Sequence, residues 1–131
     1  MQTPKLFTLL PEEYVATPDG MTIDRDGNLI LSCPNFANME LPSCILKITK
    51  EKQISKWFDV PVNPETGEAR SMGLEFGPDG DLYIVDNAGW TGRPDLIRTG
   101  RILRVHFNEH GEYESCSVVA DHMEHPNGLR I

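Results

Sequence analysis

The sequence predicts an all-β fold built from β-propeller blades, which are small antiparallel sheets of four strands each. Three observations support this prediction: a long internal repeat, Asp-Gly turns between short apolar runs, and no helical periodicity longer than about one turn. The repeat aligns GMTIDRDGNLIL at residues 20–31 with GLEFGPDGDLYI at residues 73–84, without a gap and at a spacing of 53 residues. A third copy begins with PNGLRI at residues 126–131, where the glycine comes 55 residues later.

The first half of each copy predicts a β-hairpin, because an alternating apolar run, an Asp-Gly turn and a second apolar run follow one another. These parts lie at residues 21–23, 26–27 and 29–31 in the first copy, and at residues 74–76, 79–80 and 82–85 in the second. Asp and Gly tolerate the positive φ of a tight turn, so Asp-Gly between two such runs is a strong hairpin signal.

The second half of each copy predicts another hairpin. In the first copy, strands are expected at residues 45–48 and 54–60, joined by a turn at residues 49–52. In the second copy, strands are expected at residues 102–107 and 115–120, joined by a turn at residues 108–111. Four strands in a repeat of about 40–50 residues are typical of a propeller blade. The extra length forms long loops at residues 33–43 and 87–100, both between the second and third strands, so both lie at the same end of their blades.

The repeats set the expected domain organisation. Blades are expected at about residues 16–60 and 70–121, and a third blade starts at about residue 125. A propeller closes with about four or more blades, so we expect two blades and the first strand of a third, as the N-terminal part of a larger ring. The alternative is a small β-sandwich, in which a gapless repeat is harder to place.

Composition limits the functional classes. The 131 residues carry 12 Lys and Arg against 20 Asp and Glu, a net charge of −8, which argues against binding to a nucleic-acid backbone. No apolar run approaches the roughly 20 residues of a membrane span, and no secretory signal is evident, so we expect a cytoplasmic protein. Cys33, Cys44 and Cys116 are expected as reduced, buried thiols; Cys33 and Cys44 become neighbours if they flank a loop.

The residue before each repeat glycine is a candidate metal ligand. It is Asp19 in the first copy, Met72 in the second and Asn127 in the third. The innermost strands of a propeller surround one axis, so these positions are expected to converge there. Carboxylate and amide oxygens are the ligands that calcium and magnesium prefer. The alternative is purely structural, because Pro-Asp-Gly and Pro-Asn-Gly are also common turn sequences.

The repeated pattern, followed by Pro-Asn-Gly-Leu, resembles the senescence marker protein/gluconolactonase/luciferin-regenerating family. This resemblance extends from about Ala16 to Ile131. It implies a six-bladed propeller that holds one divalent metal on its axis and hydrolyses lactones or related esters. It also implies Asp19 as a ligand where the family usually has Glu, Asn127 as a second ligand, and Ser71 or Met72 at a third position. The catalytic aspartate of the family has no counterpart, because it lies beyond Ile131.

The expected function is therefore a metal-dependent lactonase or esterase-type hydrolase, present as an N-terminal fragment that is itself inactive. Calcium is the expected metal, with magnesium, zinc and manganese as alternatives, and the substrate is a lactone or a molecule related to sugar acids. Ser71 and Trp90 are expected to contact it, although Trp90 would otherwise cover its own loop. No nucleic acid or membrane partner is expected, and the partial propeller is expected to self-associate. The rival functions are a non-catalytic binding module and a propeller enzyme similar to strictosidine synthases or phosphotriesterases.

Overall fold

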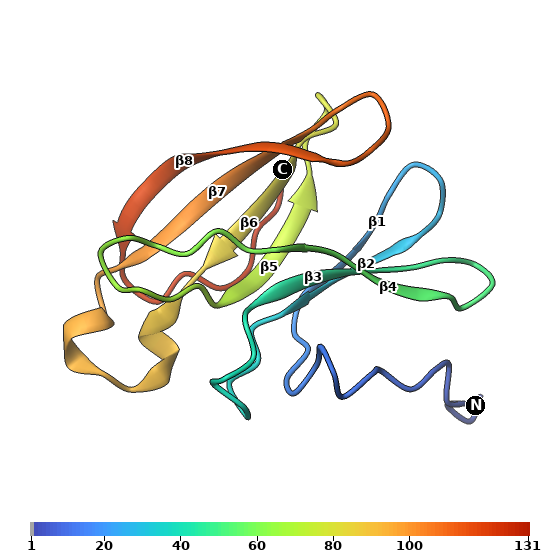
Figure 1. The fold of residues 1–131 in the computed structure, drawn as a ribbon, viewed down its shortest axis with the longest axis horizontal. Helices are drawn as coiled ribbons and strands as arrows, with labels where there is room; N and C mark the ends of the chain where they lie inside the picture. The colour runs from blue at the N-terminus through green and yellow to red at the C-terminus, as the bar shows by residue number, and fades with distance from the viewer. Residues whose placement is uncertain (1) are drawn as a thin grey trace.

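The computed structural model describes residues 2–131, which form two four-stranded antiparallel sheets (Figure 1). Each sheet is a meander in which consecutive strands are neighbours. The first sheet contains β1 (Met21–Ile23), β2 (Leu29–Cys33), β3 (Cys44–Ile48) and β4 (Ile54–Asp59). The second contains β5 (Ser71–Phe76), β6 (Leu82–Asp86), β7 (Gly100–Phe107) and β8 (Tyr113–Met123). The predicted fold class is thus confirmed, with one sheet for each repeat.

The Asp-Gly turns form as the sequence predicts. Gly27 and Gly80 have φ values of 83° and 87°, a conformation that side chains with a Cβ rarely adopt. In the first turn, the Asp24 carboxylate accepts hydrogen bonds from the backbone N–H groups of Asp26 (3.0 Å) and Asn28 (2.9 Å). A local hydrogen-bonding pattern of this kind fixes the hairpin, so the Asp24 carboxylate acts in the turn.

The main hydrophobic core lies between the two sheets. The first sheet and the residues after it contribute Ile30, Ile45, Phe58, Val60 and Ala69, and the second contributes Leu74, Leu82, Ile84, Leu103 and Val105. Fully burying one such side chain stabilises the fold by about 1.5–3 kcal/mol. Trp57 extends this core, because its ring stacks on Phe107 at a centroid distance of 4.3 Å. The two sheets therefore form one packed unit.

The opposite face of the first sheet has a second, smaller core. It contains Leu31, Cys33, Cys44, Leu46 and Ile48. Leu10, Tyr14 and Val15 pack against it, so the segment that precedes the first repeat covers this face. The segment runs below the first sheet in Figure 1.

The loop between β6 and β7 departs from the simple loop that the sequence predicts. It contains two short 3-10 helices, η1 (Ala88–Thr91) and η2 (Pro94–Leu96). Within residues 2–131, no helix is long and apolar enough to cross a membrane. Residues 124–131, where the third repeat was expected to start a strand, form no strand in the described part of the chain.

Candidate functional site

The candidate site lies where the long loops meet the starts of the inner strands. Both loops, residues 34–43 and 87–99, connect the second and third strands of a sheet. The starts of β1 and β5 lie at the same end, because each inner strand is antiparallel to its neighbour. In Figure 1 the two loops emerge on the lower side of the sheets. This end combines a rigid scaffold with loops that can vary, which is where binding sites are usually built.

Equivalent backbone positions of successive repeats touch one another at this end. A Cβ added to Gly20 would lie 2.5 Å from the backbone oxygen of Met72, next to Gly73. A Cβ added to Gly73 would lie 2.5 Å from the backbone oxygen of Asn127, next to Gly128. Both distances are shorter than real Cβ contacts, so glycine is required at Gly20 and Gly73. The third repeat therefore packs on the second as the second packs on the first, although it forms no strand.

Asp19 and Asn127, the two predicted metal ligands, have free side chains at this end. Both residues are exposed, and within residues 2–131 neither the Asp19 carboxylate nor the Asn127 amide group has a hydrogen-bond partner. Their backbones are held firmly: the Asp19 N–H donates to the oxygen of Ser32 at 2.9 Å, and the Asn127 oxygen accepts from the Gly73 N–H at 2.9 Å. Fixed backbones thus carry two free oxygen-bearing side chains.

The middle repeat offers no comparable group. Met72 is 6% exposed, and its thioether is a poor ligand for a hard cation. The Ser71 hydroxyl is fully buried and lies 2.8 Å from the hydroxyl of Ser43, which also accepts a hydrogen bond from the Ser71 N–H at 2.9 Å. This pair of hydroxyls joins the two sheets, and contact between Ser71 and a substrate stays a prediction.

Trp90 lies on η1 and is 49% exposed. Its ring faces the His125 ring at a centroid distance of 5.2 Å and an angle of 50°. The indole therefore contacts the start of the third repeat while half of its surface remains accessible.

Two buried asparagines, Asn35 and Asn87, position the backbone beside the predicted ligands. The Asn35 side chain accepts hydrogen bonds from the N–H groups of Ala16 and Thr17, which shortly precede Asp19. The Asn87 side chain donates to the oxygen of Pro126 at 2.9 Å and accepts from the Gly89 N–H at 3.0 Å. Sequence reasoning placed both residues in loops and missed these roles, which depend on contacts distant in sequence.

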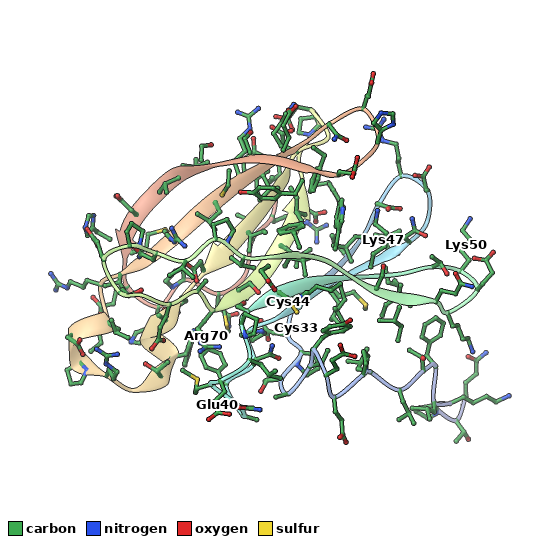
Figure 2. All side chains as sticks on the ribbon, in the orientation of Figure 1. Cys33, Glu40, Cys44, Lys47, Lys50 and Arg70 are labelled. Carbon is green, nitrogen blue, oxygen red and sulfur yellow. The ribbon has the colours of Figure 1, made fainter. Side chains whose placement is uncertain are left out.

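Arg70 holds the loop at residues 34–43 in place through its side chain. Its guanidinium donates to the backbone oxygens of Pro34 at 2.8 Å, Met39 at 3.2 Å and Leu41 at 3.3 Å. Figure 2 shows its side chain beside that loop. Burial lowers the pKa of Arg70, and the nearby Glu68 and Asp86 oppose this effect. The buried Arg70 guanidinium thus fixes the backbone of the loop at residues 34–43.

Asp86 connects this region to the rest of the second sheet. Its carboxylate accepts hydrogen bonds from the Arg70 N–H at 2.5 Å and from the Arg101 side chain at 2.6 Å. Burial raises the pKa of Asp86, while the hydrogen bonds from Arg70 and Arg101 act in the opposite direction. The ion pair between Asp86 and Arg101 is almost fully buried.

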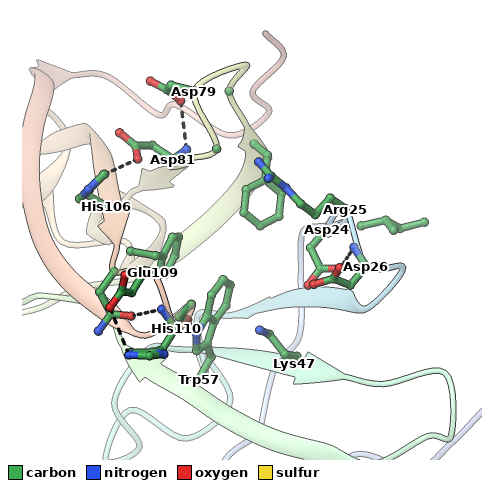
Figure 3. Close-up of a pocket in the computed structure, with 17 residues that line it drawn as sticks. Asp24, Arg25, Asp26, Lys47, Trp57, Asp79, Asp81, His106, Glu109 and His110 are labelled. Carbon is green, nitrogen blue, oxygen red and sulfur yellow. Dashed lines mark hydrogen bonds and ion pairs between the residues drawn. The ribbon is translucent and has the colours of Figure 1, made fainter.

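A cleft of about 680 Å³ lies at the other end of the sheets, among the tight hairpin turns (Figure 3). The buried acid in its lining, Asp81, is already paired: it accepts from Arg104 at 2.6 Å and lies 2.7 Å from His106. Trp57 in its wall is covered by Phe107 on one side and has the Lys47 ammonium 4.0 Å from its ring centroid. We therefore place the candidate site at the loop end.

Within residues 2–131, no group of three or more His, Cys, Asp or Glu side chains could hold a metal ion. The predicted ligand set contains only one such residue, Asp19, together with the amide of Asn127. Any metal at the loop end would therefore depend on ligands other than these four residue types, or on groups outside the described residues.

Comparisons with known proteins bear on the fold. No protein-family model matches the chain, and no curated protein matches its sequence. A solved structure described as a presumed gluconolactonase superposes on 87% of the chain with a TM-score of 0.54 and 18% sequence identity. The fold is that of propeller blades. The chain spans 38% of the length of that structure, and at this identity the likeness shows the fold alone.

Proposed function

We propose that the chain is the N-terminal part of a metal-dependent lactonase or esterase-type hydrolase related to the gluconolactonases. The observation that carries this proposal is the contact between equivalent positions of three repeats at the loop end. It brings Asp19 of the first repeat and Asn127 of the third, with free oxygen-bearing side chains, to the same end of the sheets, with Met72 of the second repeat between them. The fold likeness to a presumed gluconolactonase supports the same function class.

The side chains at this end fit a hard divalent cation in part. Carboxylate and amide oxygens suit calcium or magnesium, and both side chains are free of competing hydrogen bonds within the described residues. Met72 does not fit as a ligand, and the Ser71 hydroxyl is engaged with Ser43. Calcium takes about 6–8 oxygen ligands, so most of them would come from later blades, from water or from substrate. We propose calcium as the metal, with Asp19 and Asn127 as the ligands from this chain.

The residues at the loop end then have defined roles. Asp19 and Asn127 would hold a bound cation, and that cation would polarise the carbonyl group of a lactone. Asn87 keeps Pro126, and with it Asn127, in position through its hydrogen bond. Trp90 offers a half-exposed ring face against which a sugar-like ring can pack. The acidic residue that activates water is proposed to come from a later blade, so the 131-residue chain alone is expected to show little hydrolysis.

A non-catalytic binding module is the second candidate. The half-exposed Trp90 and the two long loops at one end favour it, because a binding surface needs only these. Propeller enzymes similar to strictosidine synthases or phosphotriesterases would use the same axis with other substrates. The coding sequence downstream of Ile131 separates these candidates: further blades with an axial aspartate support a hydrolase, and blades without one support binding alone.

The direct test is hydrolysis of a panel of sugar-acid lactones by the protein extended through its further blades, with calcium, magnesium, zinc or manganese added after chelation. The proposal predicts turnover that disappears with chelator and returns with metal. Asp19→Ala should abolish it, whereas Asp26→Ala, in an exposed turn at the opposite end, should not. Metal-independent turnover, or no turnover of any lactone, would contradict the proposal.

A further inference from the structure

Cys33 and Cys44 face each other across neighbouring strands. Cys33 ends β2, Cys44 begins β3, and the two are directly opposite in the register of the sheet. Both are buried, at 0% and 1% exposure, and both belong to the small core on the outer face of the first sheet. Figure 2 shows the pair at the base of the loop at residues 34–43. Neither thiol has a role in the proposed hydrolase.

The backbone spacing at this pair suits a covalent bond between the sulfurs. The Ser32 N–H donates to the oxygen of Gly20 in the direction of β1, so the next residue, Cys33, directs its own N–H and C=O toward β3. Opposite residues of this hydrogen-bonded type have Cα atoms about 5.5 Å apart. Disulfides span Cα distances of about 4.4–6.8 Å, which includes this spacing. The Cβ atoms of a hydrogen-bonded pair lie about 5.5 Å apart and must approach by about 1 Å or more, so closure needs a local adjustment of the two strands.

We propose that Cys33 and Cys44 form a modification site, at which a small organic disulfide converts the two thiols into a cross-strand disulfide. The third cysteine, Cys116, lies on β8 in the other sheet and packs against the other core. It is therefore the natural internal control for thiol reactivity.

The reaction balances as two thiol–disulfide exchanges. The Cys44 thiolate attacks one sulfur of the small disulfide, which breaks that S–S bond and releases one small thiolate. Cys33 then gives up its proton and attacks the Cys44 sulfur, which breaks the mixed disulfide and releases the second small thiolate. The protein loses two electrons and two protons, and the reagent is reduced to two thiols.

Cys44 is expected to react first, because its thiol lies against the covering segment and donates to the backbone oxygen of Tyr14 at 3.6 Å. The neighbouring Cys33 lowers the pKa of Cys44, and Cys44 raises the pKa of Cys33, because one thiol stabilises the negative charge on the other. Burial raises both pKa values, while Lys56 favours the Cys44 thiolate and Asp59 opposes it. The attack therefore begins at the sulfur that lies nearer the covering segment.

Residues 10–15 control access to the pair. Leu10, Tyr14 and Val15 pack on the core that contains both cysteines, and the Cys44 thiol donates to the backbone oxygen of Tyr14 at 3.6 Å. A reagent reaches Cys44 only when this segment moves away. Truncating Tyr14 to alanine removes part of the cover without touching either cysteine, so oxidation should become at least several-fold faster.

The test treats the folded 131-residue chain with 2-hydroxyethyl disulfide and follows free thiols and intact mass. The thiols of Cys33 and Cys44 should disappear with loss of two hydrogen atoms, the half-buried Cys116 can at most take up one half of the reagent, and a reductant should reverse both changes. Cleavage after Glu40 then separates the two cysteines, so the disulfide should hold the resulting peptides together. Cys116→Ala should react as the wild type does, and Cys33→Ala should stop at a mixed disulfide on Cys44.

Three results would overturn the proposal. The first is a folded wild-type chain that keeps all three thiols over a period in which the urea-unfolded chain is oxidised. The second is a disulfide between Cys116 and either Cys33 or Cys44. The third is a stable mixed disulfide on Cys44 in the wild type with no closure onto Cys33. Each can be read from the wild-type chain alone, so the test does not depend on the folding of a variant.

Discussion

The hydroxyl of Thr22 donates a 2.9 Å hydrogen bond to Oε1 of Glu75, the residue 53 positions later that occupies the same place in the next repeat. Thr22 lies in the middle of β1 and Glu75 near the end of β5. Inner strands of adjacent blades are therefore joined by side chains at equivalent positions. Residues that are 53 positions apart in the sequence, one repeat length, are thus in direct contact in the structure.

The first prediction concerns this hydrogen bond. Thr22→Val keeps the shape of the side chain and removes the donor, so the free energy of unfolding should fall by about 1 kcal/mol. Urea denaturation of Thr22→Val, Glu75→Ala and the double variant measures the coupling between the two residues. Strictly additive effects would show that the contact does not join the blades.

A second prediction tests the close approach of the repeats. Gly20→Ala places a Cβ 2.5 Å from the backbone oxygen of Met72, so we expect a loss of about 1–3 kcal/mol in the free energy of unfolding. Gly128→Ala is the matched control, because no atom lies within 4 Å of its added Cβ. Equal stability of the two variants in thermal unfolding would argue against the packing described.

The buried ion pair supplies a third prediction. Asp86→Asn leaves the Arg101 guanidinium buried without its counter-charge, which should lower the free energy of unfolding by about 3–5 kcal/mol. The control is Asp95→Asn, which alters the exposed pair with Arg93 and should have a far smaller effect. If Asp86→Asn unfolds at the same urea concentration as the wild type, the pair is not structural.

A fourth prediction concerns pH. The hydrogen bond to Asp81 raises the pKa of His106 above its ordinary value of 6.5, and the charge of Asp81 adds to this. A raised pKa means that the contribution to stability is complete below the ordinary value and is lost as pH rises through the folded value. NMR titration should show the raised pKa, and Asp81→Asn should lower it more than Glu114→Gln does. An unchanged pKa in Asp81→Asn would exclude this interaction.

The parts of the fold that depend on local sequence could be predicted. Asp-Gly turns and alternating apolar residues determine hairpins over a few residues, and the structure has all eight strands close to the predicted ranges. The proximity of Cys33 and Cys44 also followed from the loop that they flank, and the register confirms it. β8 is longer than predicted, at Tyr113–Met123, because its polar, exposed residues carry no apolar alternation.

The buried hydrogen bonds that hold the loops of the candidate site could not be predicted from the sequence. Arg70 reads as an ordinary surface cation, yet it is 4% exposed and binds the oxygens of a loop about thirty residues earlier. Asn35 and Asn87 read as turn residues, yet both are fully buried and hold segments distant in sequence. Such roles arise from packing between sheets, which local patterns do not encode.

The most direct test is calcium titration calorimetry on a chain extended through the further blades that we propose. The central claim is that Asp19 and Asn127 come together on one axis as metal ligands. We predict that Asp19→Ala and Asn127→Ala each weaken calcium binding by about 10-fold or more, and that Asp26→Ala does not. Calcium binding of equal strength in all four proteins, or none in the wild type, would contradict the claim.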